Sequence, residues 1–209
     1  MARQARRRLI LARVGFVAIG ILVVLAIAAI QVRRINAVRS AFAREVEASH
    51  VSDPSIPLVV LFAQPGCPRC DGCLERLLST SGVGRDFRLY VVVVGDPDDP
   101  VADRVSVLVE TLQRKSMTRS ALGKVRMVLS AGRSSTTLTD LEENLSGIGL
   151  STSDVLGMAE VVKQTIERNK HFVAQLGVAK TPTVLINGTT FITACPTEAE
   201  LKRILKSTR

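Results

Sequence analysis

Residues 58–73 (LVVLFAQPGCPRCDGC) constrain the fold of this chain more than any other stretch. Residues 58–62 form an apolar run with two β-branched valines, which is typical of a buried strand, and residues 64–66 (Gln-Pro-Gly) end it. Cys67 and Cys70 follow at once, at the start of a helical pattern. A cysteine in that position faces the unpaired N–H groups and the positive dipole of the helix N-terminus, which stabilise a thiolate. The stretch therefore predicts a strand–turn–helix unit that carries a redox-active pair of cysteines.

The rest of the chain predicts an α/β fold around this unit. Residues 87–94 (FRLYVVVV) indicate a second buried strand, parallel to the first because a helix separates the two. Residues 101–176 contain helical patterns, although 124–129 alternate enough to be a strand instead. The Asn-Gly pair at 187–188 stands between two β-branched runs and predicts a β-hairpin. A closing helix is expected after Thr197, which suits the N-cap position.

An uncharged segment near the start points to export. Residues 14–32 are long enough to cross a hydrocarbon core of about 30 Å. A cleaved signal peptide is the alternative, because an arginine-rich start and an Ala-Ile-Ala site at 26–28 also fit that pattern. We favour a retained anchor because the apolar run continues past that site to Ile30. The predicted organisation is a basic cytoplasmic N-terminus at 1–13, a transmembrane anchor at 14–32, a juxtamembrane helix and linker at 33–55, and a globular domain at 56–209.

The formal net charge of +9 comes mostly from the start of the chain. Nine arginines lie within the first 44 residues, five before the apolar segment and four after it. This bias predicts a single-pass protein of the cytoplasmic (inner) membrane, with the globular domain on the periplasmic side. Nucleic-acid binding is not expected, because aromatic residues make up only 3% of the chain and no Trp is present to stack on bases.

Two motifs and the order of the elements carry a resemblance to a known family. A Cys-Pro-Arg-Cys motif at 67–70 follows the first strand, and Thr181-Pro182 precedes the hairpin. With the helical insert at 101–176 between them, the chain resembles the DsbA-like family of exported thiol–disulfide oxidoreductases over 56–209. The resemblance implies a thioredoxin-like fold with a helical insertion, and an enzyme without cofactor or metal. It also implies two kinds of partner, which are exported proteins with cysteines and a membrane protein that reoxidises or reduces the enzyme.

The resemblance assigns roles to the residues of the first motif. Cys67 would be the nucleophile, and Cys70 would resolve the mixed disulfide. Pro68 and Arg69 would tune the redox potential, since the positive charge of Arg69 lies beside the thiolate. A more stable thiolate stabilises the reduced form and makes the disulfide more oxidising.

The second motif and two departures complete the expected site. Pro182 would be a cis-proline facing the cysteine pair, and the backbone of Thr181 would pair with a bound substrate strand. Gly66 stands where many relatives have a bulky residue. Leu61 stands where thioredoxins carry a buried acid, so no general base can be named. The oxidase, isomerase and reductase directions stay open.

Cys73 and Cys195 allow three interpretations. Both could be buried as small hydrophobic side chains. They could form a second disulfide, since Cys195 leaves the hairpin at the end that returns near the active site in thioredoxin-like folds. The spacing of Cys67, Cys70 and Cys73 with a distant Cys-Pro also partly matches the ligands of an iron–sulfur cluster, and four thiolates could bind zinc. A non-enzymatic interaction protein on a thioredoxin-like scaffold remains the alternative to an enzyme.

Overall fold

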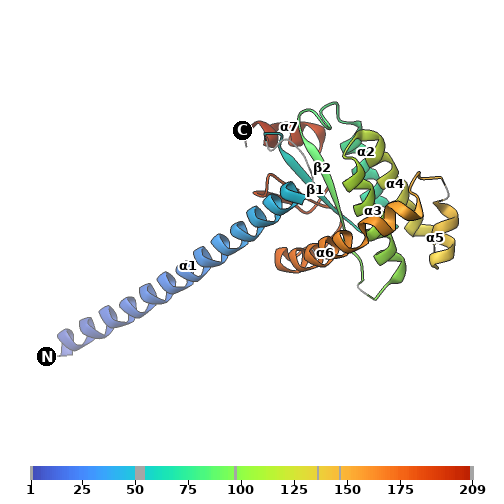
Figure 1. The fold of residues 1–209 in the computed structure, drawn as a ribbon. Coiled ribbons are helices and arrows are strands. Elements are labelled where there is room, and N and C mark those ends of the chain that lie inside the picture. Colours follow the sequence, from blue (N-terminus) through green and yellow to red (C-terminus); the bar gives the residue numbers. More distant parts are fainter. Residues whose placement is uncertain (1, 50–54, 97, 136, 146, 208–209) are drawn as a thin grey trace. The chain divides into compact units, whose positions relative to one another are not determined.

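The computed structural model describes residues 2–49, 55–96, 98–135, 137–145 and 147–207 (Figure 1). The chain forms two compact units, Met1–Val38 and Arg39–Arg209. The side chains are described from residue 19 onward, with a gap at 47–54. The linker expected at 51–57 therefore lies largely outside the described residues.

Helix α1 (Ala2–Ser49) contains the apolar segment. Its stretch Ile19–Val46 is long and apolar enough to cross a membrane, and none of the most apolar window within it is buried. Ile19, Leu22 and Ile30 each expose 60% or more of their surface. A helix that is apolar on all faces and uncovered by protein suits a membrane anchor or a signal sequence.

A four-stranded sheet forms the centre of the second unit, in the order β2-β1-β3-β4. The strands are β1 (Leu58–Ala63), β2 (Arg88–Val93), β3 (Thr183–Ile186) and β4 (Thr190–Ile192). β1 pairs with β2 in parallel, from Leu58 opposite Arg88 onward, so the predicted βαβ unit is correct. β1 pairs with β3 in the antiparallel sense, and all of its residues are buried. Both motifs of the sequence therefore adjoin the central strands of one sheet.

The hairpin between β3 and β4 forms at the Asn-Gly pair. Asn187 and Gly188 have φ values of 49° and 65°, which a two-residue turn with the twist of the flanking strands requires. Asn187 also pairs with β1, because its Oδ1 accepts a hydrogen bond from the Leu58 N–H at 2.9 Å. The turn therefore ties β3 to the start of the central strand.

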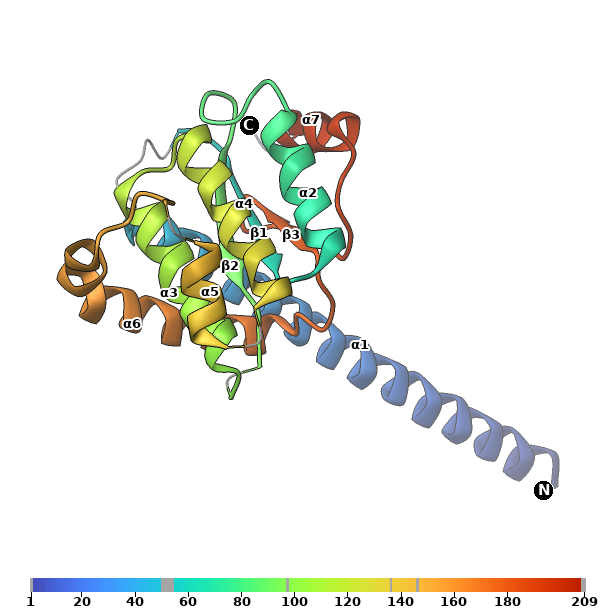
Figure 2. The same cartoon turned by 90° about the vertical axis from the view of Figure 1, so that its right-hand side faces the viewer.

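Helices make up the described part of the insert at 101–176, where no strand is present. They are α3 (Pro100–Lys115), α4 (Arg119–Ser134), α5 (Leu138–Asn144) and α6 (Thr152–Leu176). Residues 124–129 lie in α4, where Val125, Val128 and Leu129 share a buried helical face, so the strand alternative is wrong. A capping box at Ser151 begins α6, and Gly177 ends it in the left-handed conformation. α3 packs on both α4 and α6, while α4 packs on α2 (Pro68–Ser79), the helix that begins after Cys67 (Figure 2).

The C-terminal part of α1 belongs to the core of the second unit. Phe42 and Val46 are almost completely buried, and the Phe42 ring lies 5.8 Å from that of Phe62 on β1 and 5.0 Å from that of Phe172 on α6. Alternation along β1 turns Phe62 toward α1, whereas Leu61 points to the opposite face. The compact unit therefore extends back to Arg39, upstream of the start placed at 56.

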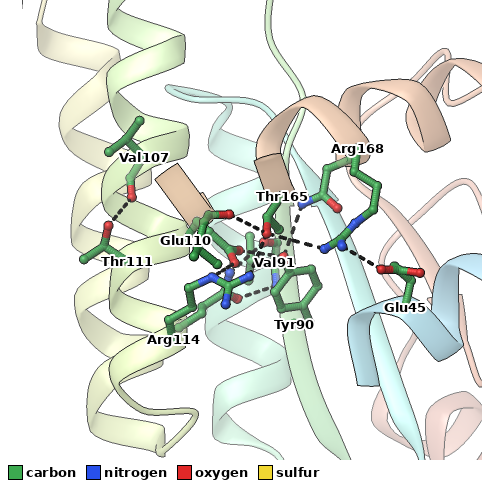
Figure 3. Close-up of polar contacts among 12 residues, drawn as sticks. Glu45, Tyr90, Val91, Val107, Glu110, Thr111, Arg114, Thr165 and Arg168 are labelled. Carbon is green, nitrogen blue, oxygen red and sulfur yellow. Dashed lines mark hydrogen bonds and ion pairs between the residues drawn. The ribbon is translucent and has the colours of Figure 1, made fainter. Parts of the chain in front are cut away.

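A buried polar network joins β2 to the helical insert (Figure 3). The Tyr90 hydroxyl donates to Glu110 Oε2 at 2.6 Å, and Arg114 Nε lies 2.8 Å from Glu110 Oε1. Asn169 of α6 donates from Nδ2 to the Tyr90 hydroxyl at 3.2 Å. Burial, with the adjacent Glu110 charge, raises the pKa of Tyr90. Because removing one partner would leave a buried charge unpaired, this network favours a single packing of α3 and α6 on the sheet.

Candidate active site

Cys67 occupies the N-cap position of α2, directly after the turn that ends β1. Its Sγ accepts a hydrogen bond from the backbone N–H of Cys70 at 3.2 Å, as capping oxygens do in other helices. Pro68 stands at the first helical position, where the missing N–H costs no hydrogen bond. Cys67 is partly exposed and lines a hollow of about 280 Å³. It is therefore the thiol of the pair that a substrate can reach.

Cys70 lies one turn further along α2 and is only 1% exposed. Burial raises the pKa of its thiol to about 11, and the Cys67 sulfur adds to the rise through a hydrogen bond and its charge. The Gln64 backbone and the Thr181 side chain act in the opposite sense. Both cysteines are free thiols in this structure. The pair thus consists of an accessible thiol and a buried thiol that stays protonated near neutral pH.

The Thr181–Pro182 loop lies next to this pair, although it is far away in the sequence. The peptide bond between the two residues is cis, and Pro182 is buried. Both residues line a groove of about 620 Å³ together with residues of α2, among them Arg69. Gln64 lines this groove as well as the hollow at Cys67, so the two spaces adjoin. The structure therefore brings the two sequence motifs together at one surface.

Helix α4 supports the turn before Cys67. The Gly66 N–H donates to the Leu129 carbonyl at 2.9 Å. Gly66 has a φ of +70°, and a Cβ at this position would lie 2.8 Å from the Arg133 Cα. Only glycine combines that conformation with such a close backbone approach. This contact accounts for Gly66, which departs from the bulky residue found in many relatives.

Arg126 of α4 also binds helix α2. Its Nε and Nη2 donate to the two carboxylate oxygens of Asp71 at 2.7 and 3.1 Å, and Nη2 donates to Glu75 at 3.0 Å. Hydrogen bonding from Arg126 and Ser130 holds the pKa of Asp71 below its ordinary value, against the opposing effect of burial. Neither Arg126 nor Asp71 was predicted as a site residue from the sequence. In the sequence, only their opposite charges hint that they pair, and whether they meet depends on how α4 packs against α2.

Cys73 and Cys195 form a disulfide, with their Cα atoms 5.4 Å apart. This is one of the three arrangements that the sequence left open. Two of the four cysteines are thereby bonded to each other and do not act as thiolate ligands. The bond joins α2 to the segment before α7 (Glu198–Ser207), on the side of α2 away from Arg126. Helix α2 is thus held by a covalent bond and by an ion pair.

No unpaired carboxylate was found near the cysteines among the residues that line the groove and the hollow. Leu61 is fully buried in β1, within the core. Asp71 is the one acidic residue of the two linings, and it is engaged by Arg126.

Comparison with known proteins gives structural matches only. No protein-family model matches the sequence, and no curated protein matches it. The thiol–disulfide exchange protein alpha-DsbA2 from Wolbachia pipientis superposes with a TM-score of 0.58 at 12% identity, covering 83% of this chain and 97% of that one. DsbA from Chlamydia trachomatis gives 0.56 at 16% identity, covering 77% and 89%. ScsC from Proteus mirabilis gives 0.53 at 19% identity, covering 99% and 97%. Similarity at these identities establishes the fold, and the predicted resemblance is confirmed at that level: the chain has the thioredoxin-like fold of the DsbA-like proteins.

Proposed function

We propose that this protein is a thiol–disulfide oxidoreductase that acts on the cysteines of exported proteins. The observation that carries the proposal is the pairing of an accessible Cys67 with a buried Cys70, beside the cis Thr181–Pro182 loop. A structural pair of cysteines would not need one exposed sulfur at a helix N-terminus. The similar solved structures include a thiol–disulfide exchange protein and DsbA, and this similarity supports the same conclusion.

The reaction proceeds by two thiol–disulfide exchanges. In the reductive direction the Cys67 thiolate attacks a substrate disulfide, a mixed disulfide forms, and one substrate thiolate leaves. The Cys70 thiol then loses its proton and attacks the Cys67 sulfur, which releases the second substrate thiolate and leaves a Cys67–Cys70 disulfide. The oxidative direction reverses these steps and transfers the disulfide to the substrate.

Formation of the mixed disulfide also prepares Cys70 for attack. Once the Cys67 sulfur is bonded to substrate, it carries no charge and no longer holds the proton on Cys70 by accepting its S–H hydrogen bond. Two of the causes that raise the pKa of Cys70 are then removed, while burial remains. The backbone of Thr181 would pair with the substrate strand at this stage and hold its sulfur near Cys67.

The apolar helix supports a membrane location for this activity. The segment Ile19–Val46 meets the length and composition of a membrane span, and the flanking arginines favour a cytoplasmic N-terminus. We propose a retained single-pass anchor in the inner membrane, with the second unit on the periplasmic side and a membrane protein as its redox partner. Fractionation and N-terminal sequencing test this: an intact N-terminus in the membrane fraction is expected, and a mature chain that begins after residue 28 would contradict the anchor.

The activity is tested with the full chain in detergent, by reduction of insulin and by oxidation of a dithiol peptide. Cys67→Ser is expected to abolish both reactions. Cys70→Ser is expected to accumulate a mixed disulfide with the substrate. Cys73→Ala with Cys195→Ala, assayed well below its lowered Tm, serves as the control, because it removes two cysteines but leaves the reactive pair. Full activity of Cys67→Ser would disprove the proposal.

A further inference from the structure

The groove beside Thr181–Pro182 is strongly cationic. Its lining contains three charged residues, Arg69, Arg76 and Lys180, and no carboxylate. All three side chains are exposed. Within the described part of the chain, none of the three pairs with an acidic side chain. We refer to this space, lined by Arg69, Arg76, Lys180 and the Thr181–Pro182 loop, as the cationic groove.

The arrangement of α2 keeps acidic residues away from the cationic groove. Arg69, Cys73 and Arg76 recur at helical spacing and line the groove together. Asp71 and Glu75 lie on the face of α2 that meets α4, where Arg126 binds both of them. Helix α2 thus carries its positive charges on the face that lines the groove and its negative charges on the face that packs against α4.

Two further parts of the lining contribute the third cation and restrain the backbone around the groove. Lys180 precedes the cis peptide bond, and its carbonyl accepts a hydrogen bond from the Thr183 hydroxyl at 2.6 Å, which fixes the loop. The Cys73–Cys195 disulfide forms part of the opposite lining. A covalent bond and a hydrogen-bonded loop therefore restrain the backbone positions from which the three cationic side chains extend.

We propose that the cationic groove selects polypeptide substrates that carry Asp or Glu next to the reacting cysteine. This inference rests on the proposed function, in which the substrate strand passes along Thr181 and beside Arg69. Carboxylates that bind there would meet three unpaired cations, whereas a basic segment would be repelled. The groove thereby selects substrates by charge, whereas the backbone contacts of Thr181 do not depend on the substrate's sequence.

The test compares three disulfide peptides that differ only in the residues flanking one cysteine: acidic, amide and basic. The full chain in a nonionic detergent is assayed for kcat/KM with each. From the usual free energy of exposed ion pairs, kcat/KM for the acidic peptide should exceed that for the basic peptide by about tenfold at low salt. At an ionic strength of about 1 M the Debye length falls to about 3 Å, and the preference should disappear.

Charge-reversal variants locate the effect. Arg76→Glu and Lys180→Glu should each reduce the preference, and together they should reverse it. Lys163→Glu is the matched control, because Lys163 is an exposed cation on α6, outside the groove, and its change in net charge is the same. Thermal unfolding checks that each variant folds, and the comparison of peptides on the unaltered protein requires no variant.

Three results would overturn the inference. Equal rates for all three peptides would refute the charge criterion, while turnover of the amide peptide would still uphold the oxidoreductase activity. Reversal by Lys163→Glu would show that net charge rather than the groove is responsible. Oxidised glutathione reacting as fast as the acidic peptide, with the same salt dependence, would assign the groove to a small anionic disulfide instead of a polypeptide.

Discussion

Removal of the Cys73–Cys195 disulfide should destabilise the protein strongly. The two cysteines are separated by 122 positions in the sequence, so the bond closes most of the second unit into one loop of the unfolded chain. The loop-closure relation gives an entropy loss of about 16 cal/mol/K, or about 5 kcal/mol at 25 °C, which is the upper limit of the stabilisation. Measured losses of native disulfides fall between about 2 and 5 kcal/mol. We therefore expect Cys73→Ala with Cys195→Ala to lower Tm by about 5–20 °C, at about 2–4 °C per kcal/mol.

The assay for this prediction follows from the composition. The chain contains one Tyr and no Trp, and Tyr90 is buried in β2. Its fluorescence therefore reports unfolding of the sheet without interference, and far-UV circular dichroism gives an independent reading. The control variant is Cys67→Ser with Cys70→Ser, which removes the other cysteine pair. A bond between those two cysteines would close a loop of only a few residues. A loss below about 1 kcal/mol in the double alanine variant would refute the loop-closure reasoning.

Three further predictions concern the residues around the turn. At pH 7.5 a small alkylating reagent should modify Cys67 of the reduced protein and leave the buried Cys70 unmodified, as read by mass spectrometry. Asp71→Asn should cost about 1 kcal/mol in chemical denaturation, because the pair with Arg126 is partly exposed. Gly66→Ala should cost at least about 2 kcal/mol in the same measurement, because alanine at positive φ is strained and its Cβ meets the backbone of α4.

Each of these predictions has its own check. Equal labelling of both active-site thiols at pH 7.5 would contradict the burial of Cys70. The pKa of Asp71 is depressed in the folded state, so its contribution is present above its ordinary value of 3.8 and is lost as pH falls further. A difference between Asp71→Asn and the unaltered protein that persists unchanged at pH 2 would therefore exclude the ion pair as its cause. Gly123→Ala in α4, where an added Cβ meets nothing within 4 Å, should instead stabilise by about 0.5–1 kcal/mol.

Patterns confined to a few neighbouring residues were predicted correctly from the sequence. The apolar run at 58–62 became β1, and the Asn-Gly pair became the hairpin turn. These features depend on dihedral preferences and hydrogen bonds within one turn of the chain, so the sequence alone contains enough information to locate them.

Contacts between distant segments were decided by the tertiary structure. Phe42 lies in a segment that was expected to be a juxtamembrane helix, yet it packs on Phe62 in the core. Arg126 binds Asp71 only because α4 lies along α2, and Gly66 is needed only because the end of α4 approaches the turn. Nothing in the spacing of these residues specifies such pairs.

Local residue patterns were enough to locate the strand–turn–helix unit with its two cysteines, the apolar N-terminal helix and the order of elements that predicts the thioredoxin-like fold. The exposure of each thiol, the use of Cys73 and Cys195, and the three cations around the groove beside Thr181–Pro182 became apparent only in the folded structure. The two kinds of feature differ in the distance along the chain over which they act. Periodicity and capping act over three or four residues, whereas burial, disulfide pairing and the sign of a groove depend on which helix faces come together after the chain has folded.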